Sequence, residues 1–422
     1  MKIGIKVMGC RLNRAEAGAL SGALEYEGHE MVAPNAPCDI LVLHSCTITA
    51  AAHSEAIRLV RSAKRKGVGH LVMSGCVANL AETEILFDAG VDTIIKKDGE
   101  IVQKTGKKPE EIFQVISRVI SDRDNTYLPS FASTRASVKV QDGCNFRCAY
   151  SIEPDARGEP ASRALNDIVY EVRGLADKGY REVVLTGVNV ACWSEGEKRF
   201  TDLIEAVIGI KGIARVRLSS IEPGTAEREI ADLMAVAGSA LCHTLHYPLQ
   251  SGDAGVLKLM RRRYTPADYA AAVEYALSKI PRLGLGADVI TGFPGETESA
   301  FNETVKLIER YPFSNLHIFP YSERPGTPAA SMPDSVPVHV RRERARELIA
   351  MGKRKKRDFA KSFVGSRAEV LVERVDESGV GRGWTSEYIE AYIKDLKNDT
   401  IGELVTINVN SEFEGKIRGS LI

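Results

Sequence analysis

The stretch Val138–Arg163, VKVQDGCNFRCAYSIEPDARGEPASR, contains the pattern from which the organisation of the chain follows. Cys144 and Cys148 lie four residues apart in a glycine-started loop, directly after the β-like run Ala136–Val140. Two thiolates held this close can share one iron–sulfur cluster, because soft sulfur ligands suit iron. A third cysteine three residues further on would complete a set of three ligands that leaves one iron open. That position holds Ser151, so this loop offers two thiols and a hydroxyl.

Strand-like runs alternate with helical patterns from Ala136 to about Pro333, around and after this loop. Six such units predict a partial (β/α)6 barrel. Active-site groups of βα barrels collect on the loops at the carboxyl ends of the strands. Four loops of this kind are LTGVNVACW (185–193), SSIEP (219–223), HYPLQSGD (246–253) and GADVITGFPGE (286–296). The predicted strands are Val138–Val140, Glu182–Leu185, Arg215–Leu218, Thr244–Tyr247, Leu285–Val289 and Asn315–Ile318.

Residues 1–100 also alternate strands and helices, which predicts a parallel α/β sheet. The expected strands are Lys2–Met8, Asp39–Leu43, His70–Met73 and Thr93–Ile95, and the expected helices are Arg14–Tyr26, Ala52–Lys66 and Leu80–Phe87. Cys10, Cys46 and Cys76 each lie just past the end of a predicted strand. The carboxyl ends of neighbouring parallel strands line one crevice. We therefore expect these three thiols to meet and to hold a second iron–sulfur cluster.

The remaining segments give the expected domain boundaries. A helix over Lys108–Ser121 and a polar linker around Asp122–Thr126 separate a first domain, 1–125, from a barrel over 135–335. A basic helix is expected over 338–361. Five short runs with Gly and Asp between them follow, and they predict a small antiparallel barrel over 365–422. These runs are Arg367–Val372, Val380–Trp384, Ile389–Ile393, Glu403–Asn410 and Glu414–Ile422.

The composition is that of a soluble globular protein, with 44% hydrophobic and 27% charged residues. No apolar run is long enough to span a membrane, and the start MKIGIKVMGC has no signal-peptide layout, so we expect a cytoplasmic protein. The formal net charge is zero, but Arg341–Lys361 carries ten Lys and Arg residues against three acidic ones, a net +7. Such a helix suits a phosphate backbone. The alternative is a solvated linker helix.

The motifs DGCNFRCAY and ARGEPASR, with GCRLNRAE, HSCTIT and SGCVA, resemble those of the radical S-adenosylmethionine (SAM) methylthiotransferases. The resemblance covers essentially the whole chain in order and implies a radical SAM barrel that ends in a TRAM-like nucleic-acid-binding domain. It implies two 4Fe-4S clusters and SAM as cofactors. One cluster would be auxiliary, on Cys10, Cys46 and Cys76, and the other would be on Cys144 and Cys148, with Ser151 at the third ligand position.

The resemblance also implies contacts with SAM and RNA. The residues expected near SAM are Tyr150, Gly187, Asn189, Gly292, Pro294, Gly295 and Glu296. The residues expected to contact RNA are Arg341, Arg342, Arg344, Arg346, Lys353, Arg354, Lys355, Lys356 and Arg357. The expected partners are the anticodon loop of a transfer RNA, an external electron donor and a sulfur source.

The branch most similar in GCRLNRAE and HSCTIT acts on N6-threonylcarbamoyladenosine, since other branches tend to carry Asp where Glu16 stands. The implied activity is insertion of a methylthio group at carbon 2 of that nucleoside. Other substrates in the family are another tRNA adenosine and a ribosomal protein. Ser151 supports a different hypothesis, a catalytically disabled or repurposed RNA-binding relative, in which Cys has become Ser naturally or by engineering. Glu153 and Asp155, which also depart from the family pattern, are either local drift or carboxylates offered to a metal.

Overall fold

The computed structural model describes residues 1–422 except 47–48, 105–109, 123–126 and 130–133. The N-terminal part is a six-stranded sheet of order β2-β1-β3-β4-β5-β6, parallel except at β6. Its strands are β1 (Lys2–Val7), β2 (Glu30–Val32), β3 (Ile40–Ser45), β4 (His70–Gly75), β5 (Thr93–Ile95) and β6 (Ile101–Gln103). The helices are α1 (Arg11–Tyr26), α2 (Ala50–Arg65), α3 (Cys76–Leu80), α4 (Thr83–Ala89) and α5 (Glu111–Ser121).

Apolar side chains cover both faces of this sheet. One buried cluster packs α1 and α5 against it, and another packs α2 and α4 on the opposite face. The predicted parallel α/β sheet is confirmed, and the short edge strands β2 and β6 are additional. The predicted helix Leu80–Phe87 is confirmed over Thr83–Phe87, which belongs to α4, but its start is wrong, because α3 ends at Leu80 and α4 begins at Thr83. The predicted linker around Asp122–Thr126 falls mostly outside the described residues, as do Thr47 and Ile48 of the HSCTIT motif and the first two residues of the predicted helix Lys108–Ser121.

Six parallel strands form the central partial barrel, in two three-stranded sheets of order β13-β10-β7 and β14-β15-β16. The bridge between Val216 and Leu241 joins the two sheets. The strands are β7 (Arg135–Lys139), β10 (Glu182–Thr186), β13 (Arg215–Leu218), β14 (Thr244–His246), β15 (Gly284–Thr291) and β16 (Phe313–Pro320). The outer helices are α7 (Leu165–Asp177), α8 (Phe200–Ile208), α9 (Glu227–Ala237), α10 (Ala254–Leu259), α11 (Pro266–Lys279) and α12 (Glu298–Arg310). The predicted (β/α)6 architecture is confirmed.

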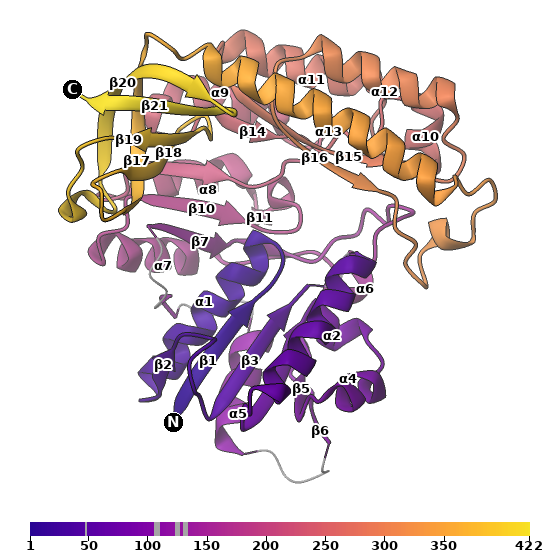
Figure 1. Ribbon diagram of the computed structural model, residues 1–422, viewed down its shortest axis with the longest axis vertical. Coiled ribbons are helices and arrows are strands. Elements are labelled where there is room, and N and C mark those ends of the chain that lie inside the picture. The colour runs from indigo at the N-terminus through magenta and orange to yellow at the C-terminus, as the bar shows by residue number, and fades with distance from the viewer. Residues whose placement is uncertain (47–48, 105–109, 123–126, 130–133) are drawn as a thin grey trace.

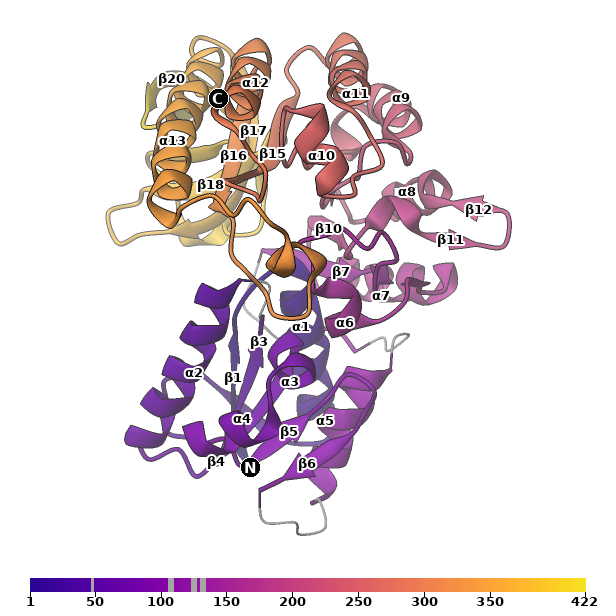
Figure 2. The same ribbon diagram turned by 90° about the vertical axis from the view of Figure 1, so that its right-hand side faces the viewer.

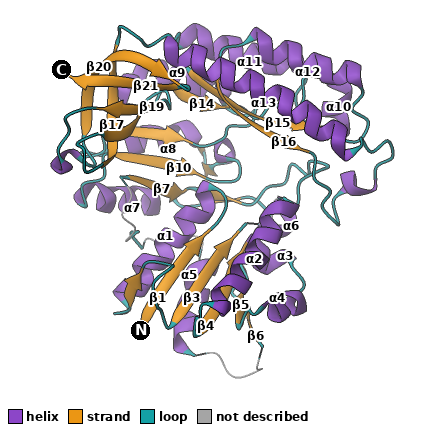
Figure 3. Ribbon diagram, in the orientation of Figure 1, coloured by secondary structure: helices purple, strands orange, loops and turns teal. Residues whose placement is uncertain are grey.

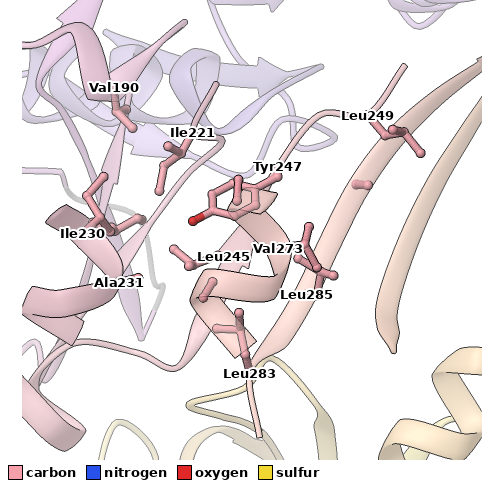
Figure 4. Packing of buried hydrophobic residues seen from close by; sticks show 14 of the residues in the cluster. Val190, Ile221, Ile230, Ala231, Leu245, Tyr247, Leu249, Val273, Leu283 and Leu285 are labelled. Carbon is pink, nitrogen blue, oxygen red and sulfur yellow. The ribbon is translucent and has the colours of Figure 1, made fainter. Parts of the chain in front are cut away.

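Short elements decorate the barrel, and its core lies between strands and helices. Strand β8 (Gln141–Asp142) pairs with β9 (Ala161–Ser162), and β11 (Ser194–Glu195) pairs with β12 (Lys198–Arg199). The short helix α6 (Glu153–Arg157) follows the cysteine loop. Figure 4 shows the packing of Leu245, Tyr247 and Leu285 against the helices, on the side of the strands away from the barrel interior.

The C-terminal part consists of helix α13 (Val338–Lys361) and a closed five-stranded barrel of order β17-β18-β19-β21-β20. Helix α13 runs along β16 (Figure 1). The barrel strands are β17 (Arg367–Val375), β18 (Gly381–Thr385), β19 (Glu390–Ile393), β20 (Leu404–Phe413) and β21 (Lys416–Leu421). The predicted small barrel is therefore confirmed. No helix in the described parts of the chain is both long and apolar enough to cross a membrane.

Buried charges attach the C-terminal barrel to the central one. Glu182 on β10 accepts hydrogen bonds from Arg215 (2.6 Å) and Arg217 (2.8 Å), and all three side chains are almost fully buried. The same two guanidinium groups donate to the backbone carbonyls of Trp384, Thr385 and Ser386. Charge-assisted hydrogen bonds of this kind are the strong ones. The end of β18 and the residue after it are thus fixed at the amino-terminal ends of the central strands.

Candidate active site

A cavity of about 820 Å³ lies where the three parts of the chain meet. Cys10 and Cys46 of the N-terminal sheet line it, as do Cys144 and Cys148 of the barrel and Tyr388 of the C-terminal domain. Figure 3 shows the arrowheads of β1 and β3 directed toward the central barrel, so the ends of these strands open onto this space. The volume lies in the upper part of the range of small-molecule sites. Figure 2 gives a second view of this junction.

The three N-terminal cysteines follow neighbouring strands, as the sequence predicted. Cys10 comes after β1, Cys46 directly after β3, and Cys76 opens α3 after β4. Glycines make the close approach possible. A Cβ on Gly9 (φ +110°) would lie 2.4 Å from the Cβ of Cys46, and one on Gly75 (φ +82°) would lie 2.6 Å from the carbonyl of Ser45. Side chains there would push these loops apart.

These thiols have the chemistry of cluster ligands. Burial raises the pKa of the Cys76 thiol to about 12, although the positive charge of Arg157 lowers it. A thiol of this kind is protonated at neutral pH and loses its proton when a metal binds. The charges of Cys46 and Cys10 also raise the pKa of Cys76, so the three thiols lie near one another. Three neighbouring, buried thiols are the ligands that an iron–sulfur cluster uses. The residues therefore fit such a cluster.

A buried network of charges, which the sequence did not predict, joins the N-terminal domain to the barrel beside these cysteines. Arg157 of α6 donates to Glu16 (3.0 Å), Asp142 (3.0 Å) and Asn13 (2.7 Å). His44 lies 3.1 Å from the second oxygen of Glu16. Burial alone would raise the pKa of the Glu16 carboxyl, but Arg157 and His44 hold it well below its usual value. The only sequence signal for this network was the position of Glu16 shortly after Cys10. The partners of Glu16, Arg157 and His44, lie far from it in the sequence, so the network could not be predicted.

The loop Cys144–Ser151 presents two thiols and one hydroxyl to the cavity. The sulfur of Cys144 accepts from the amide of Phe146 (3.4 Å), and burial raises its pKa to about 11. The sulfur of Cys148 lies 3.2 Å from Nη1 of Arg262. The hydroxyl of Ser151 accepts from the amide of Glu153 at 3.2 Å, at the start of α6. A serine hydroxyl is a much weaker acid than a thiol, so the loop lacks the third thiolate of a three-cysteine cluster site.

Three of the residues predicted to contact SAM line the cavity, namely Tyr150, Gly187 and Asn189. The hydroxyl of Tyr150 accepts from Arg262 (3.1 Å), which also forms an ion pair with the half-buried Glu222. The amide of Asn189 donates to Gln141 at 2.9 Å. Arg262 and Glu222 thereby fix the aromatic ring beside Cys148. Neither residue was assigned a role from the sequence, although Glu222 lies in the predicted loop SSIEP (219–223).

The other four residues expected near SAM, in the turn 292–296, are not among those that line the cavity. The two ends of this turn, Gly292 and Glu296, contact α13 instead. A Cβ on Gly292 would lie 2.2 Å from the Cγ of Arg341, and Glu296 accepts from Arg344 at 2.7 Å. The conformation of this turn follows from the approach of a helix, which explains the glycine without a ligand. The residues concerned are Gly292, Pro294, Gly295 and Glu296.

The same contacts alter the predicted RNA-binding surface. Arg341 and Arg344 are buried, and the guanidinium of Arg341 donates to the carbonyls of Val336 and Tyr321. Neither residue can contact a phosphate, so the prediction for these two is wrong. Arg354 pairs with Glu309, and Lys355 donates to two backbone carbonyls. Arg346 is exposed and makes only long contacts within its own helix, to the carbonyl of Arg342 (3.4 Å) and to Glu343 (4.0 Å). The other exposed or half-exposed side chains of the predicted set are Arg342, Lys353, Lys356 and Arg357.

Comparison with known proteins assigns this arrangement to a class. Residues 138–308 match the Radical SAM superfamily, and residues 2–96 match the "Uncharacterized protein family UPF0004". A solved radical S-adenosylmethionine methyltransferase, TsrM from Kitasatospora setae, has the same fold, with a TM-score of 0.58 at 16% identity over 78% of this chain and 76% of that one. The fold is therefore that of a radical SAM enzyme.

Relatives of nearly equal length narrow the assignment. The threonylcarbamoyladenosine tRNA methylthiotransferase MtaB of Bacillus subtilis (strain 168) is 32% identical over 96% of this chain and 93% of its own length. The enzyme of the same name from Chlamydia pneumoniae is 33% identical over 98% and 97%. A tRNA-2-methylthio-N(6)-dimethylallyladenosine synthase of Polynucleobacter asymbioticus is 31% identical over 100% and 98%. The chain belongs to the radical SAM methylthiotransferase family, whose cofactors are 4Fe-4S clusters and SAM.

Proposed function

We propose that the chain is a tRNA methylthiotransferase that inserts a methylthio group at carbon 2 of N6-threonylcarbamoyladenosine, next to the anticodon. The observation that carries this proposal is that Cys10 and Cys46 of one cysteine set and Cys144 and Cys148 of the other line the same cavity, in a chain that matches MtaB enzymes over almost its whole length. An unactivated carbon needs a radical and a sulfur donor in one water-poor space, and cofactors supply such chemistry. An external electron donor and a sulfur source complete the reaction.

In this proposal the N-terminal thiols hold an auxiliary 4Fe-4S cluster, which carries the sulfur to be inserted. Arg157 and Glu16 lock α6 against α1, so the two cysteine sets are held at a fixed separation. Arg262 and Glu222 orient Tyr150 beside Cys148. The side chain of Tyr388, from the C-terminal domain, forms part of the cavity wall and can contact an inserted base.

The tRNA would lie on the exposed cations of α13 and on the C-terminal barrel. The residues of α13 that we propose for phosphate contacts are Arg342, Arg346, Lys353, Lys356 and Arg357. Phosphate contacts supply affinity, whereas the cavity selects the nucleoside. A base in a single-stranded anticodon loop can turn outward into such a pocket.

Ser151 supports a second candidate, a family member that binds RNA without catalysing the reaction. The residues Cys144, Cys148 and Ser151 do not supply three thiolates, and we derive no reaction step through a cluster there. The same site would become a three-thiol site by the single change Ser151→Cys.

Transfer RNA from cells that lack their own threonylcarbamoyladenosine methylthiotransferase provides the test. Such cells are given the natural chain, Ser151→Cys or Cys76→Ala, and nucleosides from their tRNA are separated and identified by mass. The methylthio derivative of threonylcarbamoyladenosine is expected with Ser151→Cys and never with Cys76→Ala. If the natural chain also makes it, Ser151 is compatible with activity. The proposed function is wrong if a methylthio derivative of a different adenosine accumulates. It is also wrong if neither the natural chain nor Ser151→Cys produces any methylthio derivative.

A further inference from the structure

Two histidines and an aspartate meet on the wall of the cavity, outside both cysteine sets. Nε2 of His246 lies 3.2 Å from Oδ1 of Asp288, and Nδ1 of His317 lies 3.1 Å from the same oxygen. One ligand atom from each of the three residues lies within 4.8 Å of the other two. Their side chains are 19%, 28% and 51% exposed, and all three line the cavity.

The sheet β14-β15-β16 brings these residues together. Along each strand, alternate residues point to opposite faces. Leu245 and Tyr247 therefore enter the apolar core (Figure 4), whereas His246 between them faces the cavity. Asp288 and His317 are direct cross-strand partners.

A glycine gives the His246 ring the room that it needs. Gly286 is the cross-strand partner of His246, and a Cβ there would lie 2.9 Å from Cδ2 of the ring. With glycine at that position, the ring extends past β15 toward Asp288. The three residues lie on three separate strands, far apart in the sequence, so only the strand register places them side by side.

Their spacing is that of ligands around one ion. Donors about 2.1 Å from a metal are about 3.0 Å apart at right angles and about 3.4 Å apart in a tetrahedron. The separations of 3.2 Å from His246 to Asp288 and 3.1 Å from His317 to Asp288 fall within these limits. A carboxylate with two imidazoles is also the donor set of facial metal sites that keep open positions.

Each imidazole has a polar neighbour at the nitrogen that a metal would leave free. Nδ1 of His246 lies 2.9 Å from the hydroxyl of Ser220, and Nε2 of His317 lies 2.8 Å from the side-chain amide of Asn315. Metal-bound histidines commonly make an outer hydrogen bond of this kind, which fixes the tautomer and the ring. Ser220 can accept from Nδ1–H, and the Asn315 amide can accept through its oxygen after rotation.

We propose that His246, Asp288 and His317 bind one first-row divalent cation whose open coordination positions face the cavity. The donors are imidazole nitrogens and a carboxylate oxygen, so the cation is of the Mn²⁺, Fe²⁺ or Zn²⁺ type. This site is separate from the two cysteine sets and does not depend on the proposed substrate. An oxygen-bearing group of whatever enters the cavity can complete the coordination.

Mn²⁺ is the probe for the test, because thiolates bind it poorly and the electron paramagnetic resonance signal of the free ion falls on binding. The full chain is reconstituted with iron and sulfide without oxygen, freed of loosely bound iron with a chelator, and then titrated with Mn²⁺. The natural chain is expected to bind about one equivalent, and Zn²⁺ is expected to release it, following the usual order of metal affinities. Asp288→Asn and His317→Gln should each lose the site, whereas His339→Ala, an exposed histidine on α13, should keep it.

A further variant distinguishes coordination from a simple ion pair. Ser220→Ala removes only the outer hydrogen bond of His246 and should weaken Mn²⁺ binding by about 10- to 100-fold. Iron content and near-ultraviolet circular dichroism report whether each variant has folded. The proposal is overturned if the folded natural chain takes up no Mn²⁺, or if Asp288→Asn and His317→Gln bind it as the natural chain does.

Discussion

Replacing Arg157 by Met should destabilise the protein strongly, because it leaves two buried carboxylates without their main partner. The side chains of Arg157, Glu16 and Asp142 are 4%, 13% and 2% exposed. Removing one member of such a buried pair typically costs about 3 to 5 kcal/mol. Asp142 keeps Lys97 at 2.7 Å and Glu16 keeps His44 at 3.1 Å, so the lower end of the range, about 3 kcal/mol, is expected here.

The loss should depend on pH. In the natural chain the pKa of Glu16 is depressed, so its contribution to stability is present above the unfolded pKa and is lost as the pH falls through the folded value. In Arg157→Met, burial without the guanidinium raises the folded pKa, and the carboxyl then costs stability as the pH rises. The difference between the two chains should therefore be larger near pH 7.5 than near pH 5.

Urea unfolding followed by circular dichroism measures this difference. With a slope of about 3 kcal/mol per molar urea, the midpoint should fall by about 1 M near neutral pH. Arg147→Met is the matched control, since Arg147 pairs with Glu159 in the same segment but both side chains are about 70% exposed. That pair should contribute less than about 1 kcal/mol. Equal midpoints for the two variants, or a loss independent of pH, would refute the reasoning.

Three further predictions concern the clusters, the RNA surface and the C-terminal barrel. Anaerobic reconstitution should give about four irons per chain, and about eight in Ser151→Cys, by iron and sulfide assay; about eight in the natural chain would contradict this. Binding of tRNA should weaken with salt, with a log–log slope of about −0.7 per single-strand phosphate contact. Replacing four exposed cations of α13 by alanine should flatten that slope; these are Arg342, Arg346, Lys353 and Arg357. Replacing Lys198 and Arg199 on the β11–β12 hairpin by alanine should leave the slope unchanged. Removing 365–422 should lower tRNA affinity. It should also lower the thermal midpoint of the remaining domains, because it leaves Arg217 without the carbonyl groups to which it donates; an unchanged midpoint in a thermal scan would contradict this.

The sequence predicted the architecture well because strand and helix periodicity are local. It also placed Cys10, Cys46 and Cys76 correctly at the ends of neighbouring strands, since adjacency in a parallel sheet follows from chain order. Cysteine is rare enough for its position to carry information. A glycine-rich turn is too common for its position to carry the same information. The prediction for Gly292 and its neighbours therefore did not anticipate that helix α13 would pack there.

Long-range pairing was the part that the sequence could not provide. Arg341 and Arg344 belong to a basic run, and net charge alone does not distinguish cations that face solvent from cations paired in the interior. The group His246, Asp288 and His317 depends on the register of three strands. A shift of one residue in any of them would turn its side chain to the opposite face.

The contact of Arg215 and Arg217 with residues 384–386, at the end of β18, also bears on how such chains can evolve. A terminal domain joined only by a linker can be exchanged between relatives by recombination, with little effect on the rest of the protein. Here the terminal domain supplies the carbonyl groups that two buried guanidinium groups need, and it adds Tyr388 to the cavity. A replacement domain would have to reproduce that loop, or leave two cations unsatisfied inside the neighbouring barrel. Inheritance of the two domains as one unit is the expected outcome.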